Sequence, residues 1–429
     1  MRVLVLGSGG REHALVWALA NAPSVDAVLA APGNPGMADV AELVDVDLAD
    51  LDAVVDVAEN RGVDLTVVGP EGPLAAGIAD VFARRGLRLF GPTAAAAELE
   101  SSKVFAKEFC RRHGIPTADA AIVRSAAEAS EAARRFGFPV VLKADGLAAG
   151  KGVLIVTDPT ELEAAIDQLF VSRKFGAAAD RVLVEECLRG TEVSFMVISD
   201  GARWETVATS HDYKRVGDGD RGPNTGGMGS HSPAFALGAA ERSAIVDTVI
   251  APTVHGMAAE GRPYRGVLYA GLMMTADGPR VLEFNCRLGD PETQSVLRRL
   301  DGDLAETLAA AADGRLEPGR LEWSSDAAVC LVLAAENYPA SPRTGDPITG
   351  LDEAGSRPGV VVFHAGTRRD GDRWLTAGGR VLSVTATGTS LERAIDAVYR
   401  AGRMIQFDGC HHRTDIGADT LRGMESSSG

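Results

Sequence analysis

The sequence has few cysteines and no cysteine pair. Five cysteines are scattered over 429 residues, and no CxxC occurs. An odd number at irregular spacing indicates neither a disulfide framework nor a zinc site. The eight histidines show no metal-ligand spacing. We therefore expect a protein of a reducing compartment.

Long hydrophobic runs and excess positive charge are also missing. No segment approaches the roughly 18 apolar residues of a membrane span, and the apolar run after Met1 is too short for a signal peptide. Lys and Arg number 43 against 59 Asp and Glu, a formal net charge of −16. This balance disfavours nucleic acid or anionic membrane as a partner. We expect a cytoplasmic protein with no obligate protein partner, in which any site for a phosphorylated substrate is locally basic.

What remains is an ordinary globular composition and a length that suits about three domains. Residues 1–102 alternate short β-rich runs with helical patterns, which predicts an N-terminal doubly wound parallel sheet (α/β). Residues 103–325 instead show strand pairs with short connections and predict an α+β core. Residues 326–418 form a small β-rich domain that ends in a helix. Residues 419–429 are expected to be a disordered tail.

The predicted elements are short and regularly placed. In the first domain the strands are 3–6, 25–30, 65–68 and 87–90, and the first helix is 11–22. The strand pairs of the core are 140–144 with 153–156, 193–199 with 203–208, and 266–274 with 280–285. Asp277-Gly278 suits the hairpin turn of the last pair.

A glycine turn, Gly7-Ser8-Gly9-Gly10, follows the first strand and opens a helix. A dinucleotide fingerprint would place a third glycine at position 12, which is Glu12, and an acidic residue after the second strand, which runs into Ala30-Ala31-Pro32. A dehydrogenase is therefore disfavoured. The turn either binds a phosphate together with Arg11, or is a tight turn that binds nothing.

A second glycine-rich segment, Gly146 to Gly152, lies between two strands and carries Lys151. It is not a Walker motif, because three residues rather than four separate Gly146 and Gly150, and a strand rather than a helix follows. Such a flap can close over phosphates while Lys143 points in from the preceding strand. The alternative is an exposed hairpin.

Acidic residues end two further strands. Glu185 and Glu186 end one, and Glu192 beyond them is placed to accept hydrogen bonds from ribose hydroxyls; the alternative is a pair of surface glutamates. Glu283 and Asn285 share one strand face with Arg287 because side chains alternate with period two. Their oxygens suit Mg²⁺ and the arginine suits a phosphate, although cross-strand hydrogen bonding is the alternative.

Two more segments add charge and glycine. Asp212-Tyr213-Lys214-Arg215 concentrates two cations in an acidic chain, and Gly222-Pro223-Asn224-Thr225-Gly226-Gly227-Met228-Gly229 offers backbone amides to a carboxylate or phosphoryl group. The turn Arg287-Leu288-Gly289-Asp290-Pro291-Glu292 presents two further acids.

Together these segments resemble the ATP-grasp superfamily, and within it the glycinamide ribonucleotide synthetase family of de novo purine synthesis. The resemblance also includes Gly9-Gly10-Arg11-Glu12-His13-Ala14, Ala31-Pro32-Gly33-Asn34 and Val68-Gly69-Pro70-Glu71, and it extends over essentially the whole chain. It implies an ATP-grasp core with a mobile flap subdomain at about 122–189. It also implies a ligase that joins glycine to 5-phosphoribosylamine with ATP and Mg²⁺ or Mn²⁺, through glycyl phosphate, to give glycinamide ribonucleotide, ADP and phosphate.

The resemblance also implies roles for individual residues. The ATP-binding residues are Lys103, Lys143, Gly146, Gly150, Lys151, Gly152, Glu185, Glu186, Cys187, Leu188, Glu192, Arg215 and Asn224. The substrate-binding residues are Gly9, Gly10, Arg11, Glu71, Asp212, Lys214, Gly226, Met228, Arg287, Asp290 and Glu292. The catalytic residues are Lys214, Arg215, Arg287 and Asp290, and the metal ligands are Glu283 and Asn285.

Three alternatives remain beside this hypothesis. One is another ATP-grasp ligase, such as a different purine-pathway enzyme or a biotin-dependent carboxylase component. The second is a regulatory nucleotide-binding protein without turnover, and the third is the dehydrogenase. Many ATP-grasp enzymes have an acidic metal ligand on the preceding strand, but 266–274 contains no carboxylate. A second metal held wholly by the protein is therefore not expected.

Overall fold

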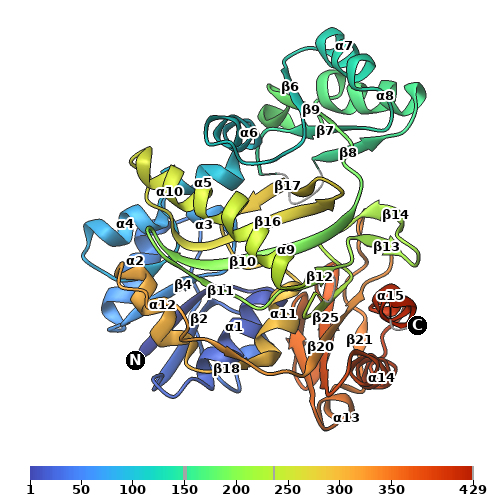
Figure 1. The fold of residues 1–429 in the computed structure, drawn as a ribbon. Coiled ribbons are helices and arrows are strands. Elements are labelled where there is room, and N and C mark those ends of the chain that lie inside the picture. The colour runs from blue at the N-terminus through green and yellow to red at the C-terminus, as the bar shows by residue number, and fades with distance from the viewer. Residues whose placement is uncertain (148–151, 235–236, 428–429) are drawn as a thin grey trace.

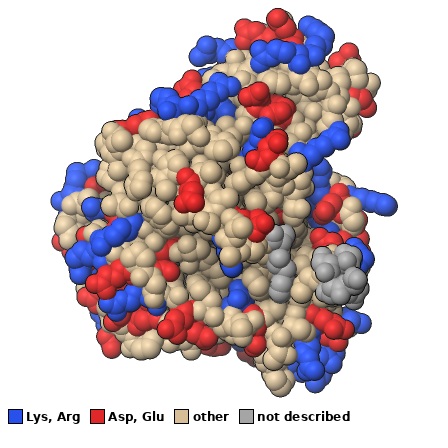
Figure 2. Space-filling model, viewed as in Figure 1, with Lys and Arg blue, Asp and Glu red and all other residues tan. Residues whose placement is uncertain are grey.

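The computed structural model describes residues 1–147, 152–234 and 237–427. Figure 1 shows a lower body formed by both ends of the chain and the middle strands, with a smaller lobe above it. No helix within the described ranges is long and apolar enough to cross a membrane. On the face shown in Figure 2, acidic and basic side chains are interspersed.

The N-terminal domain is a parallel sheet in the order β3-β2-β1-β4-β5. Its strands are β1 (Arg2–Gly7), β2 (Ala27–Pro32), β3 (Glu42–Leu43), β4 (Leu65–Val68) and β5 (Leu89–Phe90). Its helices are α1 (Gly10–Ala20), α2 (Leu51–Asn60), α3 (Glu71–Ala75), α4 (Ile78–Arg84) and α5 (Ala94–Ser101). Alternate side chains of β1 enter two different hydrophobic clusters, so both faces of the sheet are covered. The predicted doubly wound sheet is confirmed.

The upper lobe, which we call the flap subdomain, is an antiparallel sheet in the order β6-β9-β7-β8 with its own core. It contains β6 (Ala120–Val123), α7 (Ala126–Phe136), β7 (Val140–Ala144), β8 (Val153–Val156), α8 (Pro159–Ile166) and β9 (Val182–Glu186). Helix α6 (Lys103–Arg112) joins it to the body. The pairing of β7 with β8 agrees with the sequence prediction.

The central sheet has the antiparallel order β11-β10-β16-β17. Its strands are β10 (Thr191–Asp200), β11 (Trp204–Thr206), β16 (Arg265–Thr275) and β17 (Gly278–Asn285). The helices around it are α9 (Ala239–Ile245), α10 (Ala251–Ala259), α11 (Glu292–Val296) and α12 (Leu304–Ala312). Its apolar side chains share clusters with the N-terminal sheet, so these two units form one packed body.

The C-terminal sheet, in the order β12-β15-β20-β25-β22, takes two strands from the middle of the chain. These are β12 (His211–Asp212) and β15 (Gly229–Ser232), and the others are β20 (Ala327–Ala334), β22 (Val360–His364) and β25 (Arg380–Gly388). The hairpin of β13 (Arg215–Gly217) and β14 (Arg221–Asn224) lies between β12 and β15 in the chain. Smaller pairings involve β18 (Leu300–Asp301), β19 (Glu322–Trp323), β21 (Pro347–Ile348), β23 (Thr367–Asp370) and β24 (Arg373–Thr376).

The C-terminal segment differs from the sequence prediction. Helices α13 (Leu351–Gly355) and α14 (Leu391–Gly402) are followed by α15 (Ala418–Ser427), where a disordered tail was expected from residue 419. The tail is ordered by contacts with the body. Asp419 accepts a hydrogen bond from the Tyr213 hydroxyl at 2.7 Å, and the Thr420 hydroxyl lies 3.1 Å from the His231 ring nitrogen.

Candidate active site

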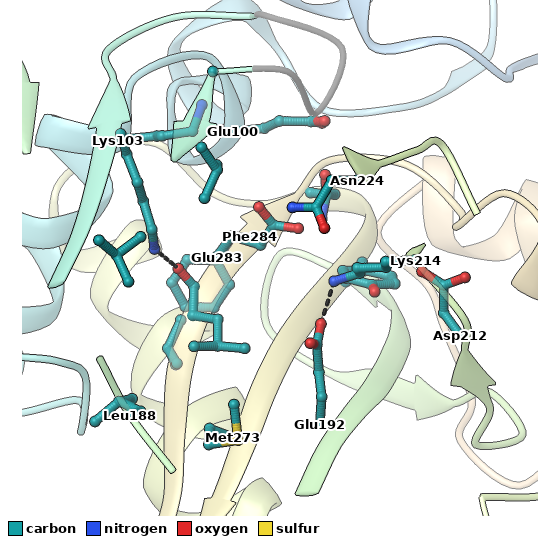
Figure 3. Close-up of a pocket in the computed structure, with 18 of the residues that line it drawn as sticks. Glu100, Lys103, Leu188, Glu192, Asp212, Lys214, Asn224, Met273, Glu283 and Phe284 are labelled. Carbon is teal, nitrogen blue, oxygen red and sulfur yellow. Dashed lines mark hydrogen bonds and ion pairs between the residues drawn. The ribbon is translucent and has the colours of Figure 1, made fainter. Parts of the chain in front are cut away.

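A cavity of about 790 Å³ lies where the flap subdomain, the central sheet and the C-terminal sheet meet. Segments as distant in sequence as Arg11 and Asp419 line it. Figure 3 shows charged side chains from several of these segments pointing into the same space. Its volume is within the range of small-molecule sites, roughly 300–1,000 Å³.

One buried carboxylate organises the end of the cavity formed by Lys143 and residues 185–192, which we call the nucleotide end. Glu185 forms ion pairs with Lys143 at 2.7 Å and Lys107 at 3.0 Å. Burial opposes ionisation, but these lysines hold the pKa of Glu185 below its ordinary value. Lys143 also donates to the Leu282 carbonyl at 2.9 Å, so its ammonium group is fixed beside β17.

The neighbouring Glu186 points the other way, because successive strand side chains alternate between faces. Its carboxylate pairs with Arg280 at 3.0 Å and accepts from the Asp119 backbone N–H at 3.0 Å. Lys103 donates to the Gly146 carbonyl at 2.9 Å, and burial lowers the pKa of Lys103. The two glutamates expected as a pair therefore have separate partners.

Glu283 and Asn285 on β17 have free oxygens. Neither side chain makes a hydrogen bond or ion pair to any residue that the structure describes, although both line the cavity. Burial opposes ionisation of Glu283, but Lys214, Lys143 and Lys103 hold its pKa below the ordinary value. An ionised carboxylate beside an amide oxygen fits Mg²⁺, which is held by one or two carboxylates plus waters and substrate oxygens.

The part of the chain that the structure describes forms no fuller metal cage. No group of three or more His, Cys, Asp or Glu side chains suited to a metal ion occurs in residues 1–147, 152–234 and 237–427. The residues present thus fit a cation that completes its coordination with substrate oxygens.

The opposite end of the cavity, which we call the acceptor end, carries Asp212 and Lys214. Lys214 forms an ion pair with Glu192, as Figure 3 shows, and Asp212 lies on its other side. Burial alone would lower the pKa of Lys214, but Glu192, Tyr269 and Glu283 raise it well above the ordinary value. Burial and the neighbouring Glu292 raise the pKa of Asp212, whose buried Oδ1 has no hydrogen-bond partner in the described structure.

Arg287 is held by two carboxylates. Its Nε lies 3.2 Å from Glu71 and one terminal nitrogen lies 3.4 Å from Glu100. Burial would lower the pKa of Arg287, but Glu100 and Glu71 raise it. Arg11 pairs with Glu12 at 2.6 Å and donates to the Leu288 carbonyl at 3.2 Å, so both guanidinium groups are oriented at this wall.

Asp290 and Glu292 follow on the same wall. Arg380 from β25 lies 2.9 Å from Asp290 Oδ2, and Gln294 donates to Asp290 Oδ1 at 2.7 Å. Burial would raise the pKa of Asp290, but Arg380 and Arg11 hold it below the ordinary value. The Glu292 carboxylate accepts from Tyr269 at 2.9 Å.

Most of the predicted site residues line this one cavity. They are Arg11, Glu71, Lys103, Lys143, Gly152, Glu185, Glu186, Cys187, Leu188, Glu192, Asp212, Lys214, Arg215, Asn224, Gly226, Glu283, Asn285, Arg287, Asp290 and Glu292. Gly150 and Lys151 lie outside the described residues.

Four predicted residues do not line the cavity: Gly9, Gly10, Gly146 and Met228. The Gly9 N–H donates to the Glu12 carboxylate at 2.6 Å, so the first glycine turn is closed by its own helix. Met228 is fully buried behind the glycine loop. These contacts account for Gly9 and Met228, and the ligand roles expected of all four residues stay predictions.

Glu100, Lys107, Tyr269 and Arg380 line the cavity but were not predicted. Lys107 had a detectable signal, because it follows Lys103 by one helical turn on α6 and so shares its face. The others are brought in only by tertiary packing.

Comparisons with known proteins cover almost the whole chain. Residues 1–100 match the phosphoribosylglycinamide synthetase N domain, 101–293 its ATP-grasp (A) domain, and 328–419 its C domain. A phosphoribosylamine–glycine ligase of Ralstonia nicotianae is 50% identical over 423 residues, which are 98% of this chain and all of that protein. One from Streptomyces coelicolor is 51% identical, with 97% of this chain and 99% of that protein covered.

Solved structures show the same architecture. A crystal structure of phosphoribosylamine–glycine ligase from Thermotoga maritima has a TM-score of 0.84 at 34% identity, and covers 97% of this chain and all of that one. A biotin carboxylase from Campylobacter jejuni has a TM-score of 0.72 at 16% identity, over 96% of this chain and 92% of that one. The second similarity shows a shared fold alone.

Proposed function

This chain belongs to the phosphoribosylglycinamide synthetase family, and from that premise we propose that its cavity joins glycine to 5-phosphoribosylamine with ATP. The products are glycinamide ribonucleotide, ADP and phosphate, in the second step of de novo purine biosynthesis. One observation carries the assignment of the cavity. The Glu283 carboxylate lines the same cavity as Lys103 and Lys143 of the nucleotide end and Lys214 of the acceptor end, and all three lysines lower its pKa. A phosphoryl group that passes between the two ends would meet all of these charges.

The nucleotide end suits ATP. We assign its phosphates to Lys103 and Lys143, with backbone groups of the glycine flap, and its adenine to the backbone of residues 186–188. Glu192 of this end forms an ion pair with Lys214, so a ribose that binds Glu192 also changes the surroundings of Lys214. Arg215 and Asn224, which are paired across the β13–β14 hairpin, face the same space near the phosphates.

Glu283 and Asn285 are the residues that would hold Mg²⁺ or Mn²⁺. A bound divalent cation would neutralise charge on the phosphates during transfer. The chain itself adds three lysines around the same carboxylate, and these also stabilise developing negative charge. Because these lysines are already in position before the phosphoryl transfer, no free energy is needed to reorient water around the developing charge.

The acceptor end suits glycine. Lys214 presents a positive charge to the glycine carboxylate, and Asp212 on the same short segment offers a carboxyl group to the glycine ammonium group. The glycine carboxylate attacks the γ-phosphorus of ATP, ADP leaves, and glycyl phosphate forms. The protonated Lys214 stabilises the charge of that transfer, and no protein nucleophile is required.

The amine substrate then attacks the carbonyl carbon of glycyl phosphate, and phosphate leaves. We assign its 5′-phosphate to Arg11 and Arg287, whose guanidinium groups are held in place by carboxylates. Asp290 and Glu292 lie beside them and can accept hydrogen bonds from the ribose or the amine. The Gly9 N–H already donates to Glu12, so we assign the 5′-phosphate to the Arg11 side chain and not to the backbone of the glycine turn. We place the reaction in the cytoplasm, with no obligate protein partner.

The test is to incubate the purified protein with ATP, Mg²⁺, glycine and phosphoribosylamine generated in situ, and to follow ADP and glycinamide ribonucleotide by mass spectrometry. Glu283→Gln would be compared with Asp277→Asn, which makes the same chemical change at the exposed turn of the same hairpin. We expect product only with all four components. We also expect Glu283→Gln to lower turnover by about 100-fold or more, as for loss of a group that stabilises transition-state charge.

Each other result has a definite meaning. ADP without glycinamide ribonucleotide would refute the assigned substrates and favour another carboxylate. ATP binding without ADP would favour a regulatory protein. Equal turnover by Glu283→Gln and Asp277→Asn would refute the assignment of Glu283 as a metal ligand.

A further inference from the structure

The C-terminal domain reaches the acceptor end through Arg380, the first residue of β25. The guanidinium group makes three contacts there. It donates to Asp290 Oδ2 at 2.9 Å, to the Asp290 carbonyl at 2.8 Å and to the Gly226 carbonyl at 2.5 Å. One side chain therefore joins the glycine loop to the Asp290 wall.

A second side chain of the C-terminal domain, Tyr338, also binds the glycine loop. The Tyr338 hydroxyl accepts from the Gly226 N–H at 2.9 Å. The C-terminal domain therefore binds both the backbone N–H and the backbone carbonyl of Gly226. A Cβ at Gly226 would lie 3.0 Å from the Arg380 guanidinium carbon. Tyr338 in turn packs on Gly379, where a Cβ would lie 2.4 Å from its ring. These close approaches fix the loop, Tyr338 and Arg380 relative to one another.

The same contact sets the charge of Asp290. The groups that face this carboxylate come from several elements: Arg380 of β25, Arg11 of α1, Gln294 of α11, Arg287, and Cys330 of β20. Arg380 is the strongest of the influences that lower the pKa of Asp290. Its removal would raise that pKa.

We propose that Arg380 is a positioning residue of the acceptor end, which holds Asp290 and the Gly226 loop in the geometry that binds the phosphoribosylamine. The inference rests on the proposed function, because it assigns that substrate to this wall. Arg380 acts through Asp290 and Gly226. An arginine suits the role since its planar fork directs donors in fixed directions to a carboxylate and two carbonyls, whereas a lysine is a single point charge on a flexible stem.

A simple interdomain salt bridge is the competing explanation, and the chain contains a matched example. Arg88 binds both carboxylate oxygens of Asp313, at 2.9 and 3.0 Å, between segments far apart in sequence and away from the cavity. Arg88→Met therefore removes a comparable bridge without touching the acceptor end.

The experiment measures steady-state kinetics of Arg380→Met, Arg380→Lys, Arg88→Met and Asp290→Asn, with thermal melting as a check on folding. For Arg380→Met we expect the KM for phosphoribosylamine to rise roughly 10- to 100-fold, the effect of losing hydrogen bonds to a charged group. The KM for ATP should stay within about twofold, since the nucleotide end is unchanged. Arg380→Lys should fall between Arg380→Met and the parent chain.

Two further readouts separate positioning from stability. The acid limb of kcat/KM against pH should move to higher pH in Arg380→Met, because the pKa of Asp290 rises. The double variant with Asp290→Asn should lose less than the sum of the single losses. Equal effects of Arg380→Met and Arg88→Met, or an equal rise of all KM values, would overturn the proposal. If Arg380→Met does not fold, the same comparison with Arg380→Lys decides. Absence of product from the parent chain would overturn the proposed function as well.

Discussion

At the residue scale, Glu185 shows how one buried carboxylate can orient two lysines of the cavity. It lies between Lys107 and Lys143, 3% exposed, and pairs with both. Among the residues that the structure describes, the Lys143 ammonium group contacts this carboxylate and the Leu282 carbonyl alone. The position of this ammonium group in the cavity therefore depends on Glu185.

We predict that Glu185→Gln raises the KM for ATP about tenfold, equivalent to about 1.4 kcal/mol of binding free energy. The amide keeps the shape of the side chain but removes the charge that orients Lys143. The measurement is ATP-dependent turnover at saturating glycine and amine. The control is Glu186→Gln on the next residue, whose carboxylate faces Arg280 instead. The idea fails if both variants change the KM for ATP equally.

Single residues were predictable where local rules apply and not where packing alone brings them together. Glu283 and Asn285 lie on one strand, so period-two alternation was enough to place both at the cavity. Glu185 and Glu186 were expected to act together, yet the same alternation separates them. Arg380 had no local signal, because nothing near it in the sequence indicates that β25 begins beside Asp290.

At the element scale, helix α15 supports the segment that carries Asp212 and Lys214. Tyr213 lies between these two residues, with its side chain buried on the opposite side. Its hydroxyl donates to Asp419 and accepts from the Gly417 N–H at 2.9 Å. The end of the chain thus anchors the residue between two acceptor-end charges.

We predict that Tyr213→Phe lowers kcat/KM for glycine roughly threefold to tenfold, the range expected for loss of one or two hydrogen bonds. The KM for ATP should change little. Tyr399→Phe is the matched control, because the Tyr399 hydroxyl holds the same C-terminal segment through Arg413 and Ile416 but lies away from the cavity. If the two variants lose glycine-dependent activity equally, general loosening of the segment explains the effect.

The elements themselves divide in the same way. The pairing of β16 with β17 followed from alternation and a turn signal, but the turn is shifted by one residue from the expected Asp277-Gly278, because Gly278 pairs with Thr275 and leaves Ala276-Asp277 at the turn. Helix α15 did not follow, because its Ser- and Gly-containing end has no apolar periodicity. Its order comes from the body through Asp419 and Thr420. The joining of β12 and β15 to the C-terminal sheet was equally invisible, since partners far apart in sequence give no local pattern.

At the scale of the whole molecule, the N-terminal and C-terminal domains meet at two buried histidines. His13 Nδ1 accepts from the His364 backbone N–H at 2.9 Å. Burial and the neighbouring His364 lower the pKa of His13 to about 3, and burial lowers that of His364 to about 4. Both rings are therefore neutral in the folded protein at mildly acidic pH, whereas the unfolded chain protonates them near pH 6.5.

The direction in which pH changes the free energy of unfolding follows from proton binding by the unfolded state. Below pH 6.5 the unfolded state binds protons that the folded state excludes, so the free energy of unfolding falls as pH falls towards the folded pKa. Each such histidine costs about 2 kcal/mol at pH 5 relative to pH 7. We predict that His13→Asn, whose Oδ1 can still accept from His364, loses about 2 kcal/mol less than the parent chain over that range.

Urea unfolding at pH 7 and pH 5 measures this difference. His255→Asn, a substitution at an exposed histidine of α10, should leave the pH dependence unchanged. If the free energy of unfolding falls equally in His13→Asn and in the parent chain between pH 7 and pH 5, His13 does not contribute to the acid sensitivity.

Arg380 and Asp419 line the cavity but come late in the sequence, which determines when during synthesis the cavity can be completed. During translation the lysines of α6 and β7 leave the ribosome long before these residues exist. The two ends of the cavity are therefore not synthesised at the same time. The cavity is therefore complete only after the C-terminal domain has been synthesised and has packed against the rest of the molecule.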